Sequence, residues 1–294
     1  MTPSETNQPA SAENGAEAIC SPAKPLSVKA LKVVAKKLRR SIITMIGQAG
    51  SGHPGGSLSA VEIVTTLYFH TMKHRPLDCQ WSERDRFILS KGHAAPLLYA
   101  VLAESGYIPA SELNTLRQIG SRLQGHTECR LVPGIEMSAG ALGQGLSFAI
   151  GAGLAARLNG EKHRIFVLLG DGECDEGQVW EAAMAAANYK LDNLTAIVDN
   201  NGIQLVGWNK DIMNIEPLGQ KWTAFGWHVI EVDGHNFEQL LSAFDKAKQT
   251  KGKPTVIIAH TIKGKGVSFM ENNPEFHGKA PTPEELKIAL KELE

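Results

Sequence analysis

The chain has 294 residues, which allows one large α/β domain or two small ones, and its 43% hydrophobic and 21% charged residues are ordinary for a soluble protein. A net charge of −1 gives no reason to expect nucleic acid or an anionic membrane as a partner. The four cysteines include no C-x-x-C pair, which argues against a structural zinc site and a disulfide framework and fits a reducing cytosol.

The first 25 residues are rich in Pro, Ser, Ala, Glu and Asn and lack the basic start and apolar core of a signal peptide. We therefore expect residues 1–25 to be a disordered extension and the protein to be cytoplasmic. The uncharged stretch 137–156 is long enough to span a membrane. Its five glycines, one glutamine and two serines favour a buried helix in a soluble domain instead.

One domain without internal repeats is expected over residues 26–294. Helical patterns are predicted over 27–48 (with Ser27 as the cap), 57–70, 96–105, 111–119, 143–158, 176–184, 237–248 and 283–293. Short apolar runs predict buried strands over 86–90, 164–169, 194–199, 227–232 and 254–259. Because strands alternate with helices, the sequence predicts an α/β fold with a doubly wound, mainly parallel sheet and helices on both faces.

Small residues share one face of the predicted helix over 143–158: Gly145, Ala149, Ala152, Gly153 and Ala156. Such a face lets another element approach closely. It fits packing within the domain or, in the slightly favoured interpretation, a contact between subunits.

Polar residues follow two neighbouring strands of the predicted sheet. Gly-Asp-Gly-Glu (170–173) comes after one strand, and Asn-Asn-Gly-Ile (200–203) ends the next. The carboxyl ends of parallel strands meet at the edge where ligands bind. There Asp171, Asn201 and a backbone carbonyl just past Asn201 offer hard oxygen ligands that suit Mg²⁺, and Gly172 leaves room for a diphosphate. Ordinary strand-to-helix turns are the alternative interpretation.

Four histidines lie beside glycines in predicted loops: His53, His93, His126 and His277. Each alone is more often a surface residue or a hydrogen-bonded core residue. Together they are candidates for one site.

These segments resemble the transketolase family. A GDG followed about thirty residues later by NN is similar to the thiamine diphosphate motif. Further segments resemble the family's SGHPG, DRFVLSxGH, GPLGQG and late HG: residues 51–56, 85–94, 140–145 and 277–278. Their order and spacing match the amino-terminal half of a transketolase over about residues 27–280, which implies the thiamine diphosphate-binding fold of the diphosphate (PP) type.

The resemblance implies thiamine diphosphate and Mg²⁺, or Ca²⁺ or Mn²⁺ in its place, as cofactors. Asp171, the side chain of Asn201 and the carbonyl of Ile203 would hold the metal, which would hold the diphosphate. The further contacts to the cofactor would come from His93, Gly140, Ala141, Leu142, Gly172, Asn201 and His277.

The same resemblance assigns the chemistry to His53, His277 and Glu176. His53 and His277 would contact the sugar near its reacting carbon and relay protons, and His126 would reach the donor substrate. Glu176 matches a glutamate that joins a proton-sharing carboxylate pair at the family's subunit interface. Glu176 could instead be a glutamate in the first turn of a helix, where the helix dipole favours a negative charge.

The implied reaction transfers a two-carbon ketol unit from a ketose or ketose phosphate to an aldose or aldose phosphate. Such reactions belong to carbohydrate metabolism, as in the pentose phosphate pathway. In the family a second, pyrimidine-binding domain supplies the glutamate that activates the cofactor. No second apolar β-α-β series follows here, so we expect the amino-terminal subunit of a split enzyme. It would be active only with a carboxyl-terminal subunit, in a heterotetramer with two chains of each kind.

Some segments depart from the family pattern. Ala141 replaces the proline of GPLGQG, and residues 123–128 (LQGHTE) replace TPGHPE. Residues 261–266 resemble the TxKGKG of 1-deoxyxylulose-5-phosphate synthase. Asn-Gly-Ile at 201–203, in contrast, favours transketolase. The alternatives are therefore another thiamine diphosphate enzyme, either synthase-like or a sugar-specialised ketolase, and a non-catalytic interaction subunit. A Rossmann dinucleotide enzyme is disfavoured, because no G-x-G-x-x-G opens a first β-α turn.

Overall fold

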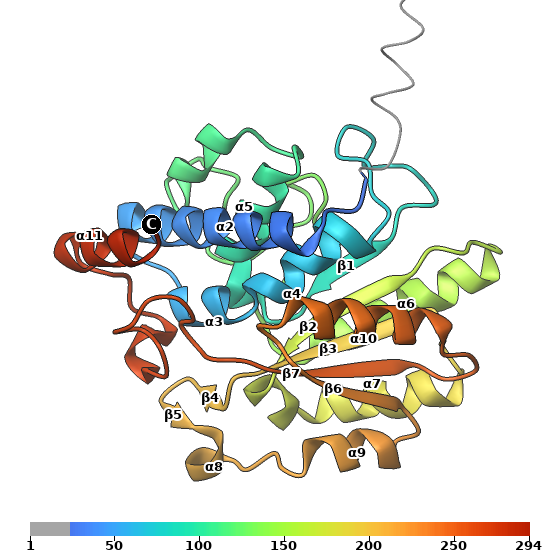
Figure 1. Cartoon of the computed structure of the whole chain (residues 1–294). Coiled ribbons are helices and arrows are strands. Elements are labelled where there is room, and N and C mark those ends of the chain that lie inside the picture. The colour runs from blue at the N-terminus through green and yellow to red at the C-terminus, as the bar shows by residue number, and fades with distance from the viewer. Residues whose placement is uncertain (1–23) are drawn as a thin grey trace, which may run out of the picture.

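A five-stranded sheet lies at the centre of residues 24–294, the part of the chain that the computed structural model describes (Figure 1). Its strands are β1 (Arg86–Leu89), β2 (Ile165–Gly170), β3 (Leu194–Asn200), β6 (His228–Asp233) and β7 (Thr255–His260). They lie in the order β1-β2-β3-β7-β6, and every neighbouring pair is parallel. All five predicted strands are confirmed to within one residue at each end.

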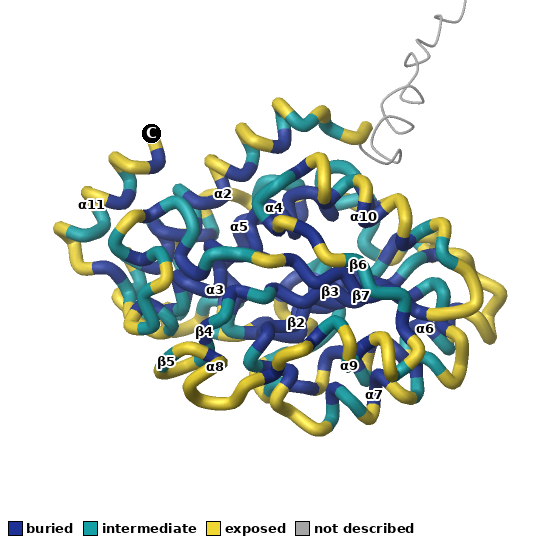
Figure 2. Tube along the Cα trace, turned by 60° about the horizontal axis from the view of Figure 1, so that its bottom comes forward, coloured by how far each residue is buried: buried dark blue, intermediate teal, exposed yellow. Residues whose placement is uncertain are grey.

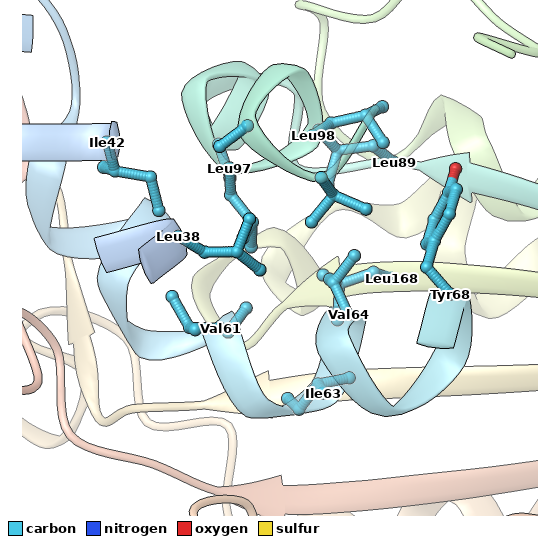
Figure 3. Packing of buried hydrophobic residues seen from close by; sticks show 14 of the residues in the cluster. Leu38, Ile42, Val61, Ile63, Val64, Tyr68, Leu89, Leu97, Leu98 and Leu168 are labelled. Atoms are coloured by element: carbon cyan, nitrogen blue, oxygen red, sulfur yellow. The ribbon is translucent and has the colours of Figure 1, made fainter. Parts of the chain in front are cut away.

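Helices cover both faces of this sheet, as predicted. One face carries α2 (Val28–Ala49), α4 (Val61–Thr66), α5 (Ala95–Glu104) and α10 (Phe237–Gln249), and α11 (Pro283–Glu292) packs on α2. Figure 3 shows the apolar contact between these helices and the sheet, and the labelled side chains include Leu38, Ile42, Val61, Val64, Leu97, Leu98, Leu89 and Leu168. Burying each such side chain stabilises the fold by about 1.5–3 kcal/mol.

The other face carries α6 (Gln144–Leu158), α7 (Gly177–Asn188) and α9 (Leu218–Ala224). Successive residues of β2 alternate between the two cores, Phe166 and Leu168 on one side and Val167 and Leu169 on the other. Because both faces are covered, β2 is buried throughout, and Figure 2 shows this buried centre beneath exposed outer helix surfaces.

The small-residue face of α6 packs inside the chain. Gly145 lies so close to Ser90, just after β1, that a Cβ at this position would overlap the serine. Gly153 faces Asn193 in the turn before β3. The favoured interpretation of this face as a subunit contact is therefore wrong, because close approach to the sheet is what requires the small residues.

Three regions differ from the predicted elements. The helix expected over 57–70 is divided into α3 (Pro54–Ser59), α4 and a π-helical turn at Leu67–Thr71. The helix expected over 111–119 is a 3₁₀ turn at Ala110–Thr115. Between β3 and β6 the chain forms elements that were not predicted: β4 (Ile203–Gln204), β5 (Gly207–Trp208), α8 (Asn209–Ile212) and α9.

The extension expected over residues 1–25 lies outside the described residues, apart from its last two. Over residues 24–294, no helix combines the length and the apolar character needed to cross a membrane. The uncharged stretch 137–156 instead contributes most of the 15-residue helix α6.

Candidate active site at the carboxyl edge of the sheet

The GDG and NNG segments meet where β2 and β3 end. Gly170 is the parallel partner of Asp199, so the two strands finish side by side. The buried carboxylate of Asp171 then accepts hydrogen bonds from the backbone N–H of Gly172 at 2.8 Å and of Gly202 at 2.5 Å. One carboxylate therefore links both strand ends.

The donor atoms around Asp171 are hard oxygens. The Asn201 Oδ1 accepts a hydrogen bond from the N–H of Ile203 at 3.2 Å, which holds the amide beside the next carbonyl. Over residues 24–294, no cluster of three or more His, Cys, Asp or Glu side chains could hold a metal. A metal here would need the amide and carbonyl oxygens beside Asp171, and this set fits a hard cation such as Mg²⁺.

Gly172 lies where the loops after β2 and β3 pass each other closely. A Cβ at this position would come within 2.7 Å of the Gln204 Cβ, so only glycine lets the two strand-end loops pass this closely. The close approach brings the loop after β3 next to Asp171, whose carboxylate accepts from the N–H groups of Gly172 and Gly202.

A second buried carboxylate, Asp199, anchors the site from within. It forms an ion pair with the buried Lys91 ammonium and accepts hydrogen bonds from Ser59 at 2.5 Å and from Thr261. Burial by itself raises its pKa, but the Lys91 charge and these hydrogen bonds hold the pKa of Asp199 below its ordinary value. Asp199 thereby joins α3, the end of β1 and the end of β7 beneath the site.

Another buried lysine, Lys263, lies at the proposed metal position. Its ammonium donates to the Ile203 carbonyl and to the His277 Nδ1, both at 2.8 Å. Burial lowers the pKa of Lys263, with the nearby Lys91 charge adding to the shift. Burial has the opposite effect on the Asp171 carboxyl, whose pKa it raises, and the Asp199 charge adds to this increase.

All four predicted histidines lie in one cluster. The ring centre of His53 is 5.6 Å from that of His93, 5.8 Å from that of His126 and 5.6 Å from that of His277. His93 and His277 are 5.1 Å apart. Figure 1 shows how the fold achieves this, because α3, β4 and the segment ahead of α11 gather at one end of the sheet.

The histidines are neutral in this environment. Burial, with the nearby charge of Arg117, lowers the pKa of His53 to about 4. Burial and the Lys263 charge lower the pKa of His277 to about 3, and burial also lowers the pKa values of His93 and His126. An ammonium can only donate, so His277 accepts at Nδ1 and carries its proton on Nε2. A neutral imidazole can donate a hydrogen bond from one ring nitrogen and accept one at the other.

The loop with Gly140, Ala141 and Leu142 is tied to this edge by Glu173. The buried Glu173 accepts hydrogen bonds from the N–H of Gly143 and of Gly170, both at 2.9 Å, and from the Ser90 hydroxyl. Gly140 borders the His126 ring. The predicted cofactor loop therefore lies between the histidine cluster and the GDG turn.

Glu176 lies at the start of α7. It is the N-cap residue of α7, makes no capping hydrogen bond through its side chain, and is exposed beside Gly143. The structure therefore leaves this carboxylate at the surface next to the cofactor loop.

Several site residues had no predicted role: Lys91, Arg117, Glu173, Asp199 and Lys263. Arg117 has a backbone φ of +58°, donates to the Ser51 hydroxyl at 2.8 Å and lies against Gly125, next to His126. The sequence signal for the lysines was present, because Lys91 and Lys263 stand in glycine-containing turns directly after apolar strands. Their partners, however, are distant in sequence.

Comparison with known proteins agrees with this geometry. Residues 30–293 match the family described as transketolase, thiamine diphosphate binding domain. The chain is 47% identical over 260 residues to the 6-deoxy-6-sulfo-D-fructose transketolase subunit SqwG of Clostridium sp. (strain MSTE9), covering 88% of this chain and 94% of the relative. It is 46% identical over 269 residues to an apulose-4-phosphate transketolase subunit of Actinobacillus succinogenes, covering 91% and 97%.

The fold is likewise that of a solved transketolase. The structure of transketolase from Campylobacter jejuni matches with a TM-score of 0.86 and 35% identity, covering 91% of this chain and 43% of that chain. This confirms the predicted fold class. The chain therefore belongs to the transketolase family of transferases, and residues 30–293 are its thiamine diphosphate-binding domain.

Proposed function

We propose that this chain is the amino-terminal subunit of a transketolase. It would help transfer a two-carbon ketol unit from a ketose or ketose phosphate to an aldose or aldose phosphate, with thiamine diphosphate and Mg²⁺. The observation that carries the proposal is the buried Asp171 carboxylate, which bridges two strand ends beside the Ile203 carbonyl, next to a cluster of neutral histidines.

The metal and the cofactor would be held at the ends of β2 and β3. Asp171, the Asn201 amide and the Ile203 carbonyl would bind the metal, and Gly172 would leave room for the diphosphate. His93 and the backbone of 140–142 would line the rest of the cofactor. When bound, thiamine diphosphate supplies the carbanion that takes up the two-carbon fragment.

The substrate would lie among His53, His126 and His277. His277, with its proton on Nε2, can donate a hydrogen bond to a sugar oxygen, because Lys263 occupies its other nitrogen. The His53 Nδ1 is buried and has no partner in the described part of the chain, so the ring is not fixed by a hydrogen bond at this nitrogen and could hydrogen-bond a sugar hydroxyl. Neutral imidazoles in a partly dry site suit both roles.

A second subunit would complete the enzyme. Both near-full-length relatives carry the word subunit in their names. We propose a carboxyl-terminal partner with the pyrimidine-binding domain, in a heterotetramer with two chains of each kind. The exposed Glu176, beside the cofactor loop, would meet the partner's carboxylate.

A test is the assay of ketol transfer by the chain alone and with its co-expressed partner. Activity is expected only for the pair, with xylulose 5-phosphate as donor and ribose 5-phosphate as acceptor, or with a sulfonated or branched sugar in their place. Product formation from pyruvate and glyceraldehyde 3-phosphate would instead favour a synthase-like enzyme. Robust turnover by the chain alone would contradict the two-subunit proposal.

A further inference from the structure

We propose that Arg117 is a positioning residue of the substrate site, whose guanidinium holds the segments that carry His53 and His126 and so sets the spacing of these two histidines. Arg117 lies in the chain between α5 and α6, just after the turn at Ala110–Thr115. The inference rests on the proposed function, because it assigns a role within the substrate site of that function.

The guanidinium of Arg117 contacts the residues ahead of both histidines. Its Nη1 donates a hydrogen bond to the Ser51 hydroxyl at 2.8 Å, two residues before His53. Its Cζ lies so close to Gly125, the neighbour of His126, that a Cβ on this glycine would come within 2.8 Å of it. Over the described residues, no hydrogen bond joins the two segments directly, so Arg117 provides the link between them.

The backbone of Arg117 is held in an uncommon conformation. Its φ of +58° lies in the left-handed region, which residues other than glycine seldom adopt. Its N–H donates to the Leu123 carbonyl at 2.9 Å, which closes the intervening chain into a loop that leads on to His126. Such a conformation persists where the surrounding contacts determine it, and it is concentrated at functional sites. The backbone and the side chain of Arg117 therefore both act on the His126 segment.

The His126 segment has a second support in Tyr99 on α5. The Tyr99 hydroxyl lies 3.0 Å from the Gln124 carbonyl and 3.2 Å from the His126 carbonyl. Tyr99 thus holds the backbone of this segment to α5, whereas Arg117 holds its distance from Ser51. With both contacts present, the ring centres of His53 and His126 are 5.8 Å apart. Loss of the guanidinium should therefore change the spacing of the two histidines without unfolding the segment.

Arg117 also gives both histidines the same nearby cation. After burial, its charge is the next largest cause of the lowered pKa of His53 and of the lowered pKa of His126. The other titratable groups around His53 are His93, His126, Lys263 and His277. Because a guanidinium stays charged throughout the working pH range, Arg117 helps to keep both imidazoles neutral.

The test compares Arg117→Lys with the wild type in the full chain assembled with its partner. Lysine keeps the charge but lacks the planar fork that spans Ser51 and Gly125, so kcat/KM for ketol transfer should fall ~10–100-fold. Calorimetry should find an unchanged affinity for thiamine diphosphate with Mg²⁺, because none of the proposed cofactor ligands is altered. Arg122, in an ion pair with Glu112, is the matched control, and Arg122→Lys should change kcat/KM by less than ~3-fold.

Two further readouts separate this positioning role from ordinary packing. In Arg117→Ala, millimolar guanidinium chloride should restore kcat/KM by ~10-fold, because the free ion can occupy the place of the lost side chain. In the full chain without its partner, nuclear magnetic resonance should show the titration midpoints of His53 and His126 moving to higher pH in Arg117→Ala. The midpoint of His228, whose neighbouring cations are Lys253 and Lys246, should stay unchanged.

The outcomes separate the positioning role from the proposed function. If the wild-type pair transfers no ketol unit, both are overturned. If the pair is active and Arg117→Lys and Arg117→Ala match its kcat/KM, the positioning role is wrong and the proposed function stands. Should Arg117→Ala fail to fold, Ser51→Ala removes the partner of the guanidinium and leaves its charge in place. Ser51→Ala should lower kcat/KM ~10-fold, and wild-type activity of this variant would overturn the positioning role.

Discussion

Asp171 and Asp199 are buried carboxylates on neighbouring strands, yet their surroundings give them opposite properties. Asp199 has a lysine and two hydroxyls as partners, which keep it ionised. Asp171 has only backbone N–H groups as hydrogen-bond partners, and its pKa is raised by burial. A buried carboxylate without a direct ion pair at the end of a strand is available as a metal ligand, whereas Asp199, which is anchored by Lys91, has a structural role.

A third buried carboxylate, Glu62, allows a test of stability against pH. Burial by itself raises its pKa, but hydrogen bonds from His235 and Arg39 and the Arg39 charge lower the pKa of Glu62 to about 2. A carboxyl whose pKa is depressed on folding stabilises the protein above its unfolded pKa, and this contribution is lost as the pH falls through the folded pKa.

Glu62→Gln should therefore lower the free energy of unfolding at pH 7 by about 3–5 kcal/mol, because it leaves Arg39 buried without its carboxylate. The difference from the wild type should shrink as the pH falls from about 4.5 towards about 2. Urea denaturation across this range measures both. Glu275→Gln, in an exposed pair with Lys279, is the control and should change stability by less than about 0.5 kcal/mol. A pH-independent loss in Glu62→Gln would contradict the assigned pKa.

At the scale of elements, α6 contains two glycines with opposite surroundings. Gly145 packs against Ser90 at the end of β1, whereas Gly151 is exposed, and a Cβ added to it would meet nothing within 4 Å. Gly145→Ala should destabilise the chain by about 1–3 kcal/mol through overpacking. Gly151→Ala should stabilise it by about 0.4–1 kcal/mol, because alanine is the better helix former. Thermal unfolding compares them directly, and equal effects would contradict the close contact of α6 with the sheet.

The five strands and most long helices could be predicted from the sequence, because strands buried on both faces are uninterrupted apolar runs. The segment 203–224 could not, since β4 and β5 have two residues each and carry no periodic pattern. The division of 54–71 into three helical pieces was missed because its residues, polar ones included, are buried nearly throughout, so no exposed face marks a break.

For the candidate site, the residues in local motifs could be predicted from the sequence, but the buried residues that pair over long distances in sequence could not. The histidines and strand-end ligands could be found because each lies in a glycine-rich turn next to a strand. Lys91 and Asp199, by contrast, are 108 residues apart in sequence, and no local pattern joins them. The roles of His53, His126, His277 and Glu176 stay predictions.

At the scale of the whole molecule, apolar side chains are exposed on the outer helices α6 and α7. Phe148 on α6 and Met184 on α7 are 44% and 54% exposed. We expect the partner subunit to cover them, since Glu176 at the start of α7 is the proposed partner-facing carboxylate. The double variant Phe148→Glu, Met184→Glu should raise the dissociation constant for the partner ~10-fold or more and leave the fold of this chain intact.

Leu77→Glu is the control for this interface, because Leu77 is 72% exposed and belongs to the loop before β1 rather than to α6 or α7. Sedimentation of the co-expressed subunits measures the assembly. Undiminished assembly of the double variant would show that the partner binds elsewhere.

The central claim is that Asp171 holds the metal through which thiamine diphosphate binds. Calorimetric titration of the cofactor with Mg²⁺ into the assembled enzyme tests it most directly, with Asp171→Ala compared to Asp211→Ala, an exposed aspartate on α8. We predict that Asp171→Ala loses measurable cofactor binding and that Asp211→Ala binds as the wild type does. Wild-type affinity in Asp171→Ala would contradict the account.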